Sequence, residues 1–135
     1  MVDYMNLAAA FVSSAEKDPT KPALFWGEQV FSYGLLLSQT RQLAIHLQEE
    51  LGVKPGDRVG VWLKNCPEFV PALFGTLLAG AVVVPINNFL KPNEVNHILA
   101  DADVDVLITD EAAAAAVAKV VAMAEAVAAT EAAKR

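Results

Sequence analysis

The sequence has a single cysteine, Cys66, and few basic residues. One cysteine allows neither an internal disulfide nor a cysteine-based zinc site, so we expect a reducing compartment, the cytoplasm. The chain contains 10 Lys and Arg residues and 16 Asp and Glu residues, which gives a formal net charge of −6. Nucleic acids and anionic membranes bind to surfaces with clustered Lys and Arg, so neither is expected as a partner. Asp3 near the start and the lack of a basic stretch there argue against a secretory signal.

The chain also lacks the common motifs of catalytic and nucleotide sites. Neither G-x-x-x-x-G-K-[ST] nor G-x-G-x-x-G occurs, so no phosphate loop or dinucleotide turn is indicated. His46 and His97 are far apart and each lies in a helical pattern, which favours surface or half-buried helix positions over ligand roles. Cys66 lies at an expected helix start, where a thiol pKa is lowered. With no histidine placed beside it, packing or capping is preferred over a nucleophilic role.

Charged residues are absent from positions 69–89, a length that could span a bilayer. Four glycine and proline residues interrupt this run: Pro71, Gly75, Gly80 and Pro85. They divide it into two pieces, one with the residue spacing of a helix and one with that of a strand. A buried helix followed by a buried strand explains the run, so no membrane span is predicted.

The stretch 57–86 predicts a strand, a crossover helix and a second strand. Val59, Val61 and Leu63 alternate with other residues after a Pro-Gly-Asp turn. The helix is expected to begin at Asn65-Cys66-Pro67-Glu68, with a polar cap and proline at the first helical position. Residues 81–86 form a β-branched run without a polar face, typical of a parallel strand covered on both sides. Together these make a right-handed βαβ unit.

The flanking sequence predicts an open, mainly parallel α/β sheet with helices on both faces, a Rossmann-like arrangement of three layers. Asn6 is expected to cap a first helix over 7–17, and Ser32 a second helix that ends at Gly52. Between them, residues 23–26 and 29–32 flank Gly27-Glu28 and predict a hairpin. Another helix begins at Pro92, and residues 104–110 form the third parallel strand. The side chains expected to face the core are Leu7, Phe11 and Ala15 in the first helix, Leu35, Leu36, Ala44 and Leu47 in the helix capped by Ser32, and Val95, Ile98 and Leu99 in the helix that begins at Pro92.

The last segment, 111–135, differs from the α/β domain at 1–110. It is rich in alanine and has no Gly, Pro or aromatic residue, which predicts one long helix packed on the same domain. Val117, Val120, Val121, Ala124 and Val127 give it a modest apolar stripe. Two origins stay open, an engineered helix, which is the preferred interpretation, and a natural low-complexity tail.

Residues 6–110 resemble the N-terminal part of the adenylate-forming superfamily, which includes acyl-CoA synthetases, luciferases and peptide-synthetase adenylation domains. The resemblance rests on ordered pieces: NLAAAF, PALFWGEQVFSYGLLL, GVKPGDRVGVWLKNCPEFVPALFGTLLAGAVVVPIN, LKPNEVNHILADAD and VDVLITD. Within the superfamily, the sequence is most similar to the fatty acyl- and aryl-CoA ligases. The resemblance implies a parent reaction in which ATP adenylates a carboxylate that is then passed to CoA, with ATP, Mg²⁺ and CoA as cofactors.

The motifs that carry this chemistry in the family do not occur here. The family binds ATP phosphates through a Ser/Thr/Gly-rich loop ending in Pro-Lys-Gly and completes adenylation with a lysine of a mobile C-terminal domain. No residue of this chain matches either motif. The resemblance therefore implies ancestry from a ligase, with no catalytic residue and no cofactor expected for this chain itself.

One binding-site hypothesis rests on the expected sheet alone. Ligands of open parallel sheets bind beyond the carboxyl ends of the strands. Here those ends carry Lys64-Asn65, Asn87-Asn88 and Asp110. The alternative, which we prefer, is that the amides and the acid cap helices and turns. For Asp110, capping the terminal helix is also preferred over a phosphoacceptor role like that in receiver domains.

Three functions remain open from the sequence. The first and preferred one is a truncated or engineered ligase subdomain that is not catalytically competent alone. The second is an interaction module whose apolar surface pairs two copies, as a homodimer, or binds the remainder of the parent enzyme. The third is weak nucleotide or acyl-CoA binding without turnover.

Overall fold

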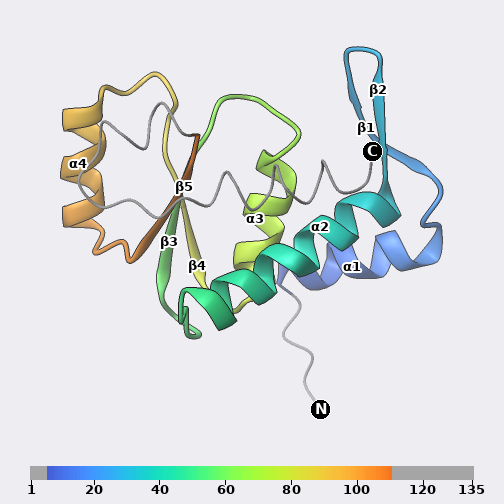
Figure 1. The fold of residues 1–135 in the computed structure, drawn as a ribbon, viewed down its shortest axis with the longest axis horizontal. Helices are drawn as coiled ribbons and strands as arrows, with labels where there is room; N and C mark the ends of the chain where they lie inside the picture. The colour runs from blue at the N-terminus through green and yellow to red at the C-terminus, as the bar shows by residue number, and fades with distance from the viewer. Residues whose placement is uncertain (1–5, 111–135) are drawn as a thin grey trace.

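The computed structural model describes residues 6–110. The alanine-rich helix expected at 111–135, and its capping by Asp110, lie outside the described residues. The elements follow the chain in the order drawn in Figure 1: α1 (Leu7–Lys17), β1 (Pro22–Trp26), β2 (Gln29–Ser32), α2 (Tyr33–Ile45), the π-helical turn η1 (His46–Glu50), β3 (Arg58–Trp62), α3 (Phe69–Leu78), β4 (Val82–Pro85), α4 (Pro92–Asp101) and β5 (Val106–Thr109).

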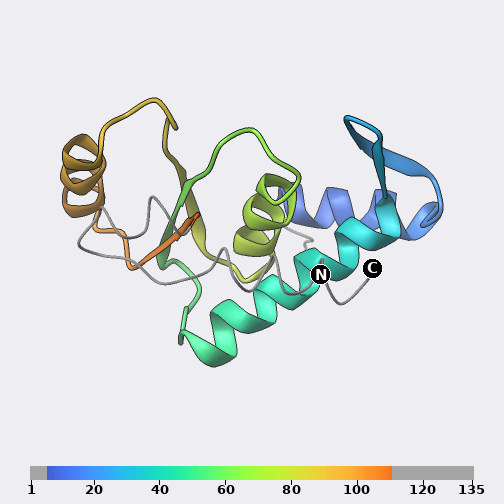
Figure 2. The same ribbon diagram turned by 45° about the horizontal axis from the view of Figure 1, so that its top comes forward.

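The predicted fold class is confirmed. Three parallel strands form a sheet in the order β4-β3-β5, and β1 and β2 form a separate antiparallel hairpin. In Figures 1 and 2, α4 covers one face of the sheet, and α3 with α2 covers the opposite face. The result is a three-layer arrangement in which the hairpin projects from the helical layer.

The predicted βαβ unit is present, but the environment predicted for its second strand is wrong. Within residues 6–110, β4 pairs only with β3 and forms an edge of the sheet. Val82 is 47% exposed, and Val83 and Val84 are half-buried. A β-branched run without polar residues is therefore compatible with an edge position as well as with a central one.

The start of α3 also differs from the prediction. Regular helix begins at Phe69, two residues after Pro67, which had been expected at the first helical position. A tighter turn precedes it, because the Phe69 N–H donates to Cys66 O at 3.1 Å and the Val70 N–H donates to Pro67 O at 3.2 Å. In both hydrogen bonds the N–H lies three residues after the carbonyl oxygen, a 3₁₀ pattern that is common at helix termini.

Helix α1 has the predicted cap, and of its three residues predicted to face the core, Phe11 and Ala15 do so but Leu7 does not. Asn6 Oδ1 accepts the Ala9 N–H at 2.9 Å. Ala8 and Ala15 are buried and Phe11 stacks on Phe74 of α3, with the ring centroids 4.5 Å apart. Leu7, expected to face the core, is 65% exposed, because the small Ala8 faces the core in its place.

The hairpin and the α2 helix agree with the prediction. Gly27 has a φ of +59°, which a glycine at a hairpin turn adopts at no steric cost. Ser32 Oγ accepts the Leu35 N–H at 3.1 Å and so caps α2. The last turn widens to the π-helical η1, and Gly52, with a φ of +67°, ends it as predicted.

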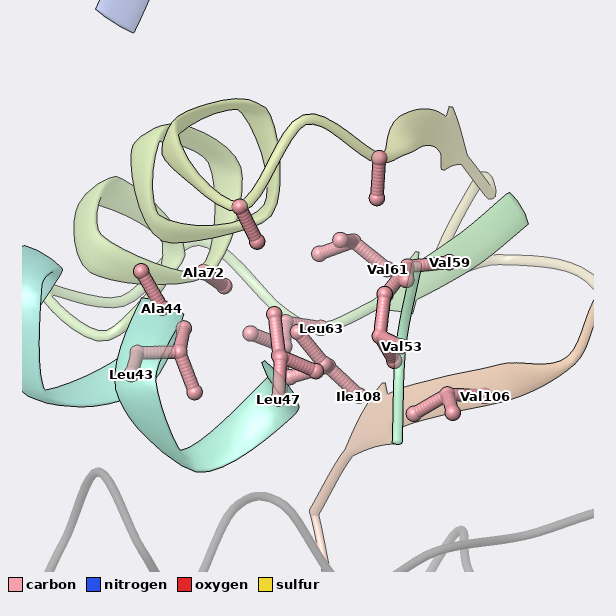
Figure 3. Close-up of a cluster of buried hydrophobic side chains, with 12 residues drawn as sticks. Leu43, Ala44, Leu47, Val53, Val59, Val61, Leu63, Ala72, Val106 and Ile108 are labelled. Atoms are coloured by element: carbon pink, nitrogen blue, oxygen red, sulfur yellow. The ribbon is translucent and has the colours of Figure 1, made fainter. Parts of the chain in front are cut away.

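The main core lies between the sheet and the α2–α3 layer (Figure 3). Leu43 and Ala44 of α2 and Leu47 of η1 belong to this core, together with Val59 and Val61 of β3 and Val106 and Ile108 of β5. A smaller cluster under α4 comprises Trp62, Ile86, Val95, Leu99, Val104 and Leu107. Of the side chains predicted to face inward from α4, Val95 and Leu99 are buried and Ile98 packs against this cluster.

Candidate functional site

The carboxyl ends of the three parallel strands meet at one edge of the sheet. Val61 is level with Pro85, and Trp62 is level with Thr109. The segments that leave these ends carry Lys64-Asn65 after β3, Asn87-Asn88 after β4 and Asp110 after β5. The structure therefore brings the four candidate residues Asn65, Asn87, Asn88 and Asp110 to the same edge.

Neighbouring strands at this edge send their connections to opposite faces. The chain leaves β3 toward α3, and it leaves β4 toward α4 on the other face (Figure 1). In open α/β sheets, a crevice forms at such a switch point, and ligands bind there. The geometry of β3 and β4 thus meets the general condition for a strand-end site.

The Asn87 side chain already has a role in its own loop. Its Oδ1 accepts the Phe89 N–H at 2.9 Å, while its carbonyl oxygen accepts the Leu90 N–H at 3.1 Å. These hydrogen bonds fix a tight turn that leaves Phe89 87% exposed and lets Leu90 pack against the cluster under α4. This geometry supports the capping interpretation for Asn87.

The other three candidates differ in burial. Asn65 and Asn88 are exposed, whereas Asp110 is half-buried. Thr109, which sequence reasoning did not single out, makes a buried side-chain hydrogen bond at this edge. Its Oγ1 donates to Trp62 O at 2.7 Å and is fully enclosed. A threonine at the end of an otherwise apolar strand was the available signal, because a buried hydroxyl needs a partner.

Acidic residues lie at the helix N-termini next to this edge. The Glu94 Oε1 accepts the Lys91 N–H at 2.9 Å at the start of α4. Glu68 immediately precedes the first residue of α3, although its side chain makes no capping hydrogen bond there. Helix N-termini attract anions, and a carboxylate placed there satisfies that preference within the chain. The arrangement is consequently a poor match to a phosphate site.

The pKa predicted for Cys66 is wrong in direction. Burial, and then the nearby Glu68 carboxylate, raise the pKa of the Cys66 thiol to about 11. Both effects disfavour the thiolate, and regular helix begins three residues later, so the N-terminal dipole does not dominate. Cys66 packs against the main core, which agrees with the preferred packing role.

The histidines are not brought together with other ligand-type residues. His46 begins η1 and is half-buried, and His97 is exposed on α4. Among residues 6–110, no three His, Cys, Asp or Glu side chains are grouped so that they could hold a metal ion. None of the helices in this part of the chain is long and apolar enough to cross a bilayer.

Comparison with known proteins places the fold in a family. The description "AMP-binding enzyme" applies to a family that matches residues 11–135, a range that includes the alanine-rich segment. The chain belongs to the AMP-binding enzyme family. The resemblance that the ordered sequence pieces indicate is thereby confirmed.

Curated relatives of this AMP-binding family member include long-chain-fatty-acid–CoA ligases. The chain is 34% identical over 105 residues to the ligase of Salmonella typhimurium, covering 78% of this chain and 19% of the relative. With the ligase of Bacillus subtilis the identity is 38% over 105 residues, covering 77% of this chain and 18% of the relative. The chain thus spans about a fifth of the length of the curated relatives it matches.

Solved structures of adenylation enzymes share the fold. The N-terminal subdomain of Klebsiella oxytoca NpsA in complex with anthranilyl-AMSN superposes with a TM-score of 0.82 at 22% identity, covering 95% of this chain and 34% of that one. The o-succinylbenzoate CoA synthetase (MenE) of Bacillus subtilis, bound to a product analogue, gives a TM-score of 0.78 at 23% identity, covering 87% of this chain and 25% of that one. At sequence identities of 22% and 23%, these superpositions show a shared fold alone.

Proposed function

We propose that residues 6–110 form the N-terminal α/β scaffold of an acyl-CoA ligase. The parent reaction is the ATP-dependent adenylation of a carboxylate, followed by its transfer to CoA. The observation that carries this proposal is the identity of 34–38% to long-chain-fatty-acid–CoA ligases over a stretch that includes most of the fold. The preference for a long-chain fatty acid rests on these relatives alone.

In this proposal the scaffold contributes shape and leaves the chemical step to other parts of a ligase. The polar groups best placed at the strand ends serve the fold itself. Asn87 holds its own loop, and Thr109 ties β5 to β3. A chain with these residues alone is expected to lack adenylation activity.

A graft tests the ligase assignment. In the Bacillus subtilis ligase, the matching stretch is replaced by residues 6–110 of this chain, and ATP-dependent formation of long-chain acyl-CoA is measured. We expect the graft to be active, because the incoming scaffold presents the same fold to the remainder of that enzyme. A folded, soluble graft without acyl-CoA formation contradicts the proposal. The same graft carrying Gly75→Leu, which obstructs the α2–α3 contact, is the matched control and is expected to be inactive.

The 135-residue chain alone tests the second half of the proposal. In an ATP–pyrophosphate exchange assay with fatty acids, we expect no signal above background. Titration with ATP and short acyl-CoA compounds, followed by NMR at Asn65 and Asn87, addresses binding without turnover. Exchange above background contradicts the scaffold role, and shifts at both asparagines without exchange favour the strand-end binding site.

A second candidate function is self-association through the β1–β2 hairpin. Phe25 and Val30 are cross-strand partners on one face of the hairpin, and they are 69% and 53% exposed. Adjacent exposed apolar side chains are typical of contact surfaces. Light scattering over a concentration series measures the molar mass, and we expect Phe25→Ser to remove any dimer. Glu28→Ser, at the polar turn of the same hairpin, is the matched control. A monomer at high concentration contradicts this candidate.

A further inference from the structure

The outer edge of the sheet at β4 carries apolar side chains and no charge. Positions 69–89 contain no charged residue, and within residues 6–110 β4 pairs only with β3. Val82 is 47% exposed, Pro85 is exposed and Phe89 is 87% exposed, and the two valines between Val82 and Pro85 are half-buried. We refer to these five residues as the β4 edge strip. Sheet edges that face water commonly carry charged side chains that prevent association, and this edge has none.

The backbone of β4 allows little further strand pairing. The Val82 N–H donates to Asp57 O at 2.7 Å, so the backbone groups of Val82 point toward β3. These directions alternate along a strand, which turns the backbone groups of Val83 and Pro85 outward. Pro85 has no N–H, so Val83 is the one residue of β4 that offers an outward N–H. A partner at this edge therefore packs against the side chains and does not extend the sheet.

The loop after β4 holds Phe89 in its exposed position. The Asn87 side chain accepts the Phe89 N–H at 2.9 Å. Ile86 before this turn is buried, and Leu90 after it packs against the cluster under α4. In Figure 1, the loop between β4 and α4 stands clear of the sheet. Because the turn is fixed at both ends, little backbone freedom is lost when a partner buries Phe89, and aromatic residues are frequent among the dominant contacts of interfaces.

The size of the relatives indicates what covers the β4 edge strip. The matched stretch is 18–19% of the long-chain-fatty-acid–CoA ligases, so about four-fifths of such an enzyme lies outside it. Permanent interfaces are more apolar than transient ones, and charged residues are depleted at their centres. The β4 edge strip has this composition, whereas charged residues flank it at Glu68 and Lys91.

We propose that the remainder of an acyl-CoA ligase packs on the β4 edge strip, with Phe89 as the anchor that enters an apolar pocket of that remainder. This inference rests on the proposed function of residues 6–110 as a ligase scaffold. The partner surface contributes apolar side chains and no strand, because Pro85 limits pairing. Phe89 follows Asn87 and Asn88 at the carboxyl edge of the sheet, so the same contact brings the remainder of the enzyme to the switch point between β3 and β4.

Thermal melting of the Bacillus subtilis ligase graft and of the 135-residue chain tests the proposal. Phe89→Ser and Val82→Lys are made in both proteins. We expect each to lower the melting temperature of the graft by a few degrees more than that of the chain, because the contact exists only in the graft. Val30→Lys, at a 53% exposed valine of β2, is the matched control and is expected to shift both proteins equally. If Val82→Lys prevents folding of the graft, Val82→Thr replaces it.

Three outcomes overturn the proposal. Equal shifts of graft and chain for Phe89→Ser and Val82→Lys show that nothing in the ligase covers these residues. An equally large excess shift for Val30→Lys shows that the β4 edge is not the surface concerned. A 135-residue chain that is a dimer by light scattering and becomes a monomer on Val82→Lys shows that a second copy covers the strip.

The readouts for the proposed function and for this inference are separate. Formation of acyl-CoA by the unmodified graft tests the ligase assignment. The melting shifts need no turnover, so a soluble graft that lacks activity contradicts the assignment and still decides whether the β4 edge strip is covered.

Discussion

Gly75 of α3 lies close against Leu43 of α2, and substitution to alanine tests that contact. A Cβ added at Gly75 of α3 would lie 3.0 Å from both Cβ and Cδ2 of Leu43 in α2 and 3.1 Å from its Cγ. Leu43 is a core residue with 3% exposure, so it has little space in which to move. Two opposing effects then decide the stability of Gly75→Ala.

Alanine in place of glycine within a helix favours folding by about 1 kcal/mol. Overpacking a close contact costs about 1–3 kcal/mol, since neighbouring side chains or the backbone must shift. The contact at Gly75 involves three atoms of one side chain, including a Cβ that cannot rotate away. We therefore expect Gly75→Ala to lower the free energy of unfolding by about 1 kcal/mol, the difference between a mid-range cost and the helix term.

Urea unfolding followed by tryptophan fluorescence measures the effect, with the m-value checked for constancy. Ser14 is exposed in α1, and comparing Ser14→Ala with Ser14→Gly supplies the helix term alone. Leu43→Ala removes two of the three contacting atoms, so the double variant is expected to show a coupling of about 1 kcal/mol or more. If Gly75→Ala is as stabilising as the Ser14 pair indicates, the two helices do not approach this closely and the reasoning is refuted.

Three further predictions concern other parts of the structure and are tested by unfolding or reactivity measurements. Within residues 6–110, Thr76 Oγ1 and Thr40 Oγ1 are buried and have no hydrogen-bond partner, so Thr76→Val is expected to be neutral or to stabilise. Thr109→Val, by contrast, loses the hydrogen bond to Trp62 O and is expected to cost about 1 kcal/mol, and equal costs for the two variants would contradict the assignment. Asp103 follows α4 with a φ of +53°, so Asp103→Gly is expected to stabilise by about 1 kcal/mol, and Asp103→Ala, the control, is expected to bring no gain. The raised pKa of about 11 keeps the Cys66 thiol protonated at neutral pH, so alkylation is expected to be slow at pH 7 and to accelerate until the pH exceeds that pKa. Glu68→Gln removes the nearby charge and is expected to lower the pKa and increase the rate at pH 8, and an unchanged pH–rate profile would argue against the role of Glu68.

The features that the sequence predicted well depend on neighbouring residues. Asn6 and Ser32 cap their helices through an amide three residues ahead, and Gly52 adopts the positive φ that ends η1. The hairpin at Gly27 belongs to the same group. Each of these signals is complete within one short segment, so no knowledge of the tertiary structure is needed.

The features that it missed depend on packing between distant segments. The run 81–86 has the same composition whether it lies at the edge or the centre of a sheet, and strand order decides which. Helical spacing shows that α1 is amphipathic, but whether Leu7 or Ala8 faces the core depends on the distance to α3. For Cys66, burial and the Glu68 carboxylate outweigh the helix start that the sequence displays.

The candidate site was predictable in location, and the preferred capping role agrees with the hydrogen bond of Asn87, but the role of Thr109 was not predicted. The parallel sheet places Asn65, Asn87, Asn88 and Asp110 at one edge, as the strand pattern indicated. That Asn87 holds its own turn, and that Thr109 supplies the buried hydrogen bond, follows from side-chain geometry alone. An asparagine that caps a loop and one that binds a ligand have the same sequence signature.

The strand order β4-β3-β5 has a consequence for folding during synthesis. Of the three parallel strands, β3 leaves the ribosome first, so the central strand of the sheet is present before either outer strand. β4 and then β5 each add to a free edge of β3, and no strand pair that has already formed needs to separate. Domains fold as units while translation proceeds, and contacts between distant segments slow folding. The Asn6 side chain, which donates to Leu77 O from 71 positions away, can make its hydrogen bond only after α3 has emerged. The N-terminal helix is thus expected to be fixed in place late, although its residues are translated early.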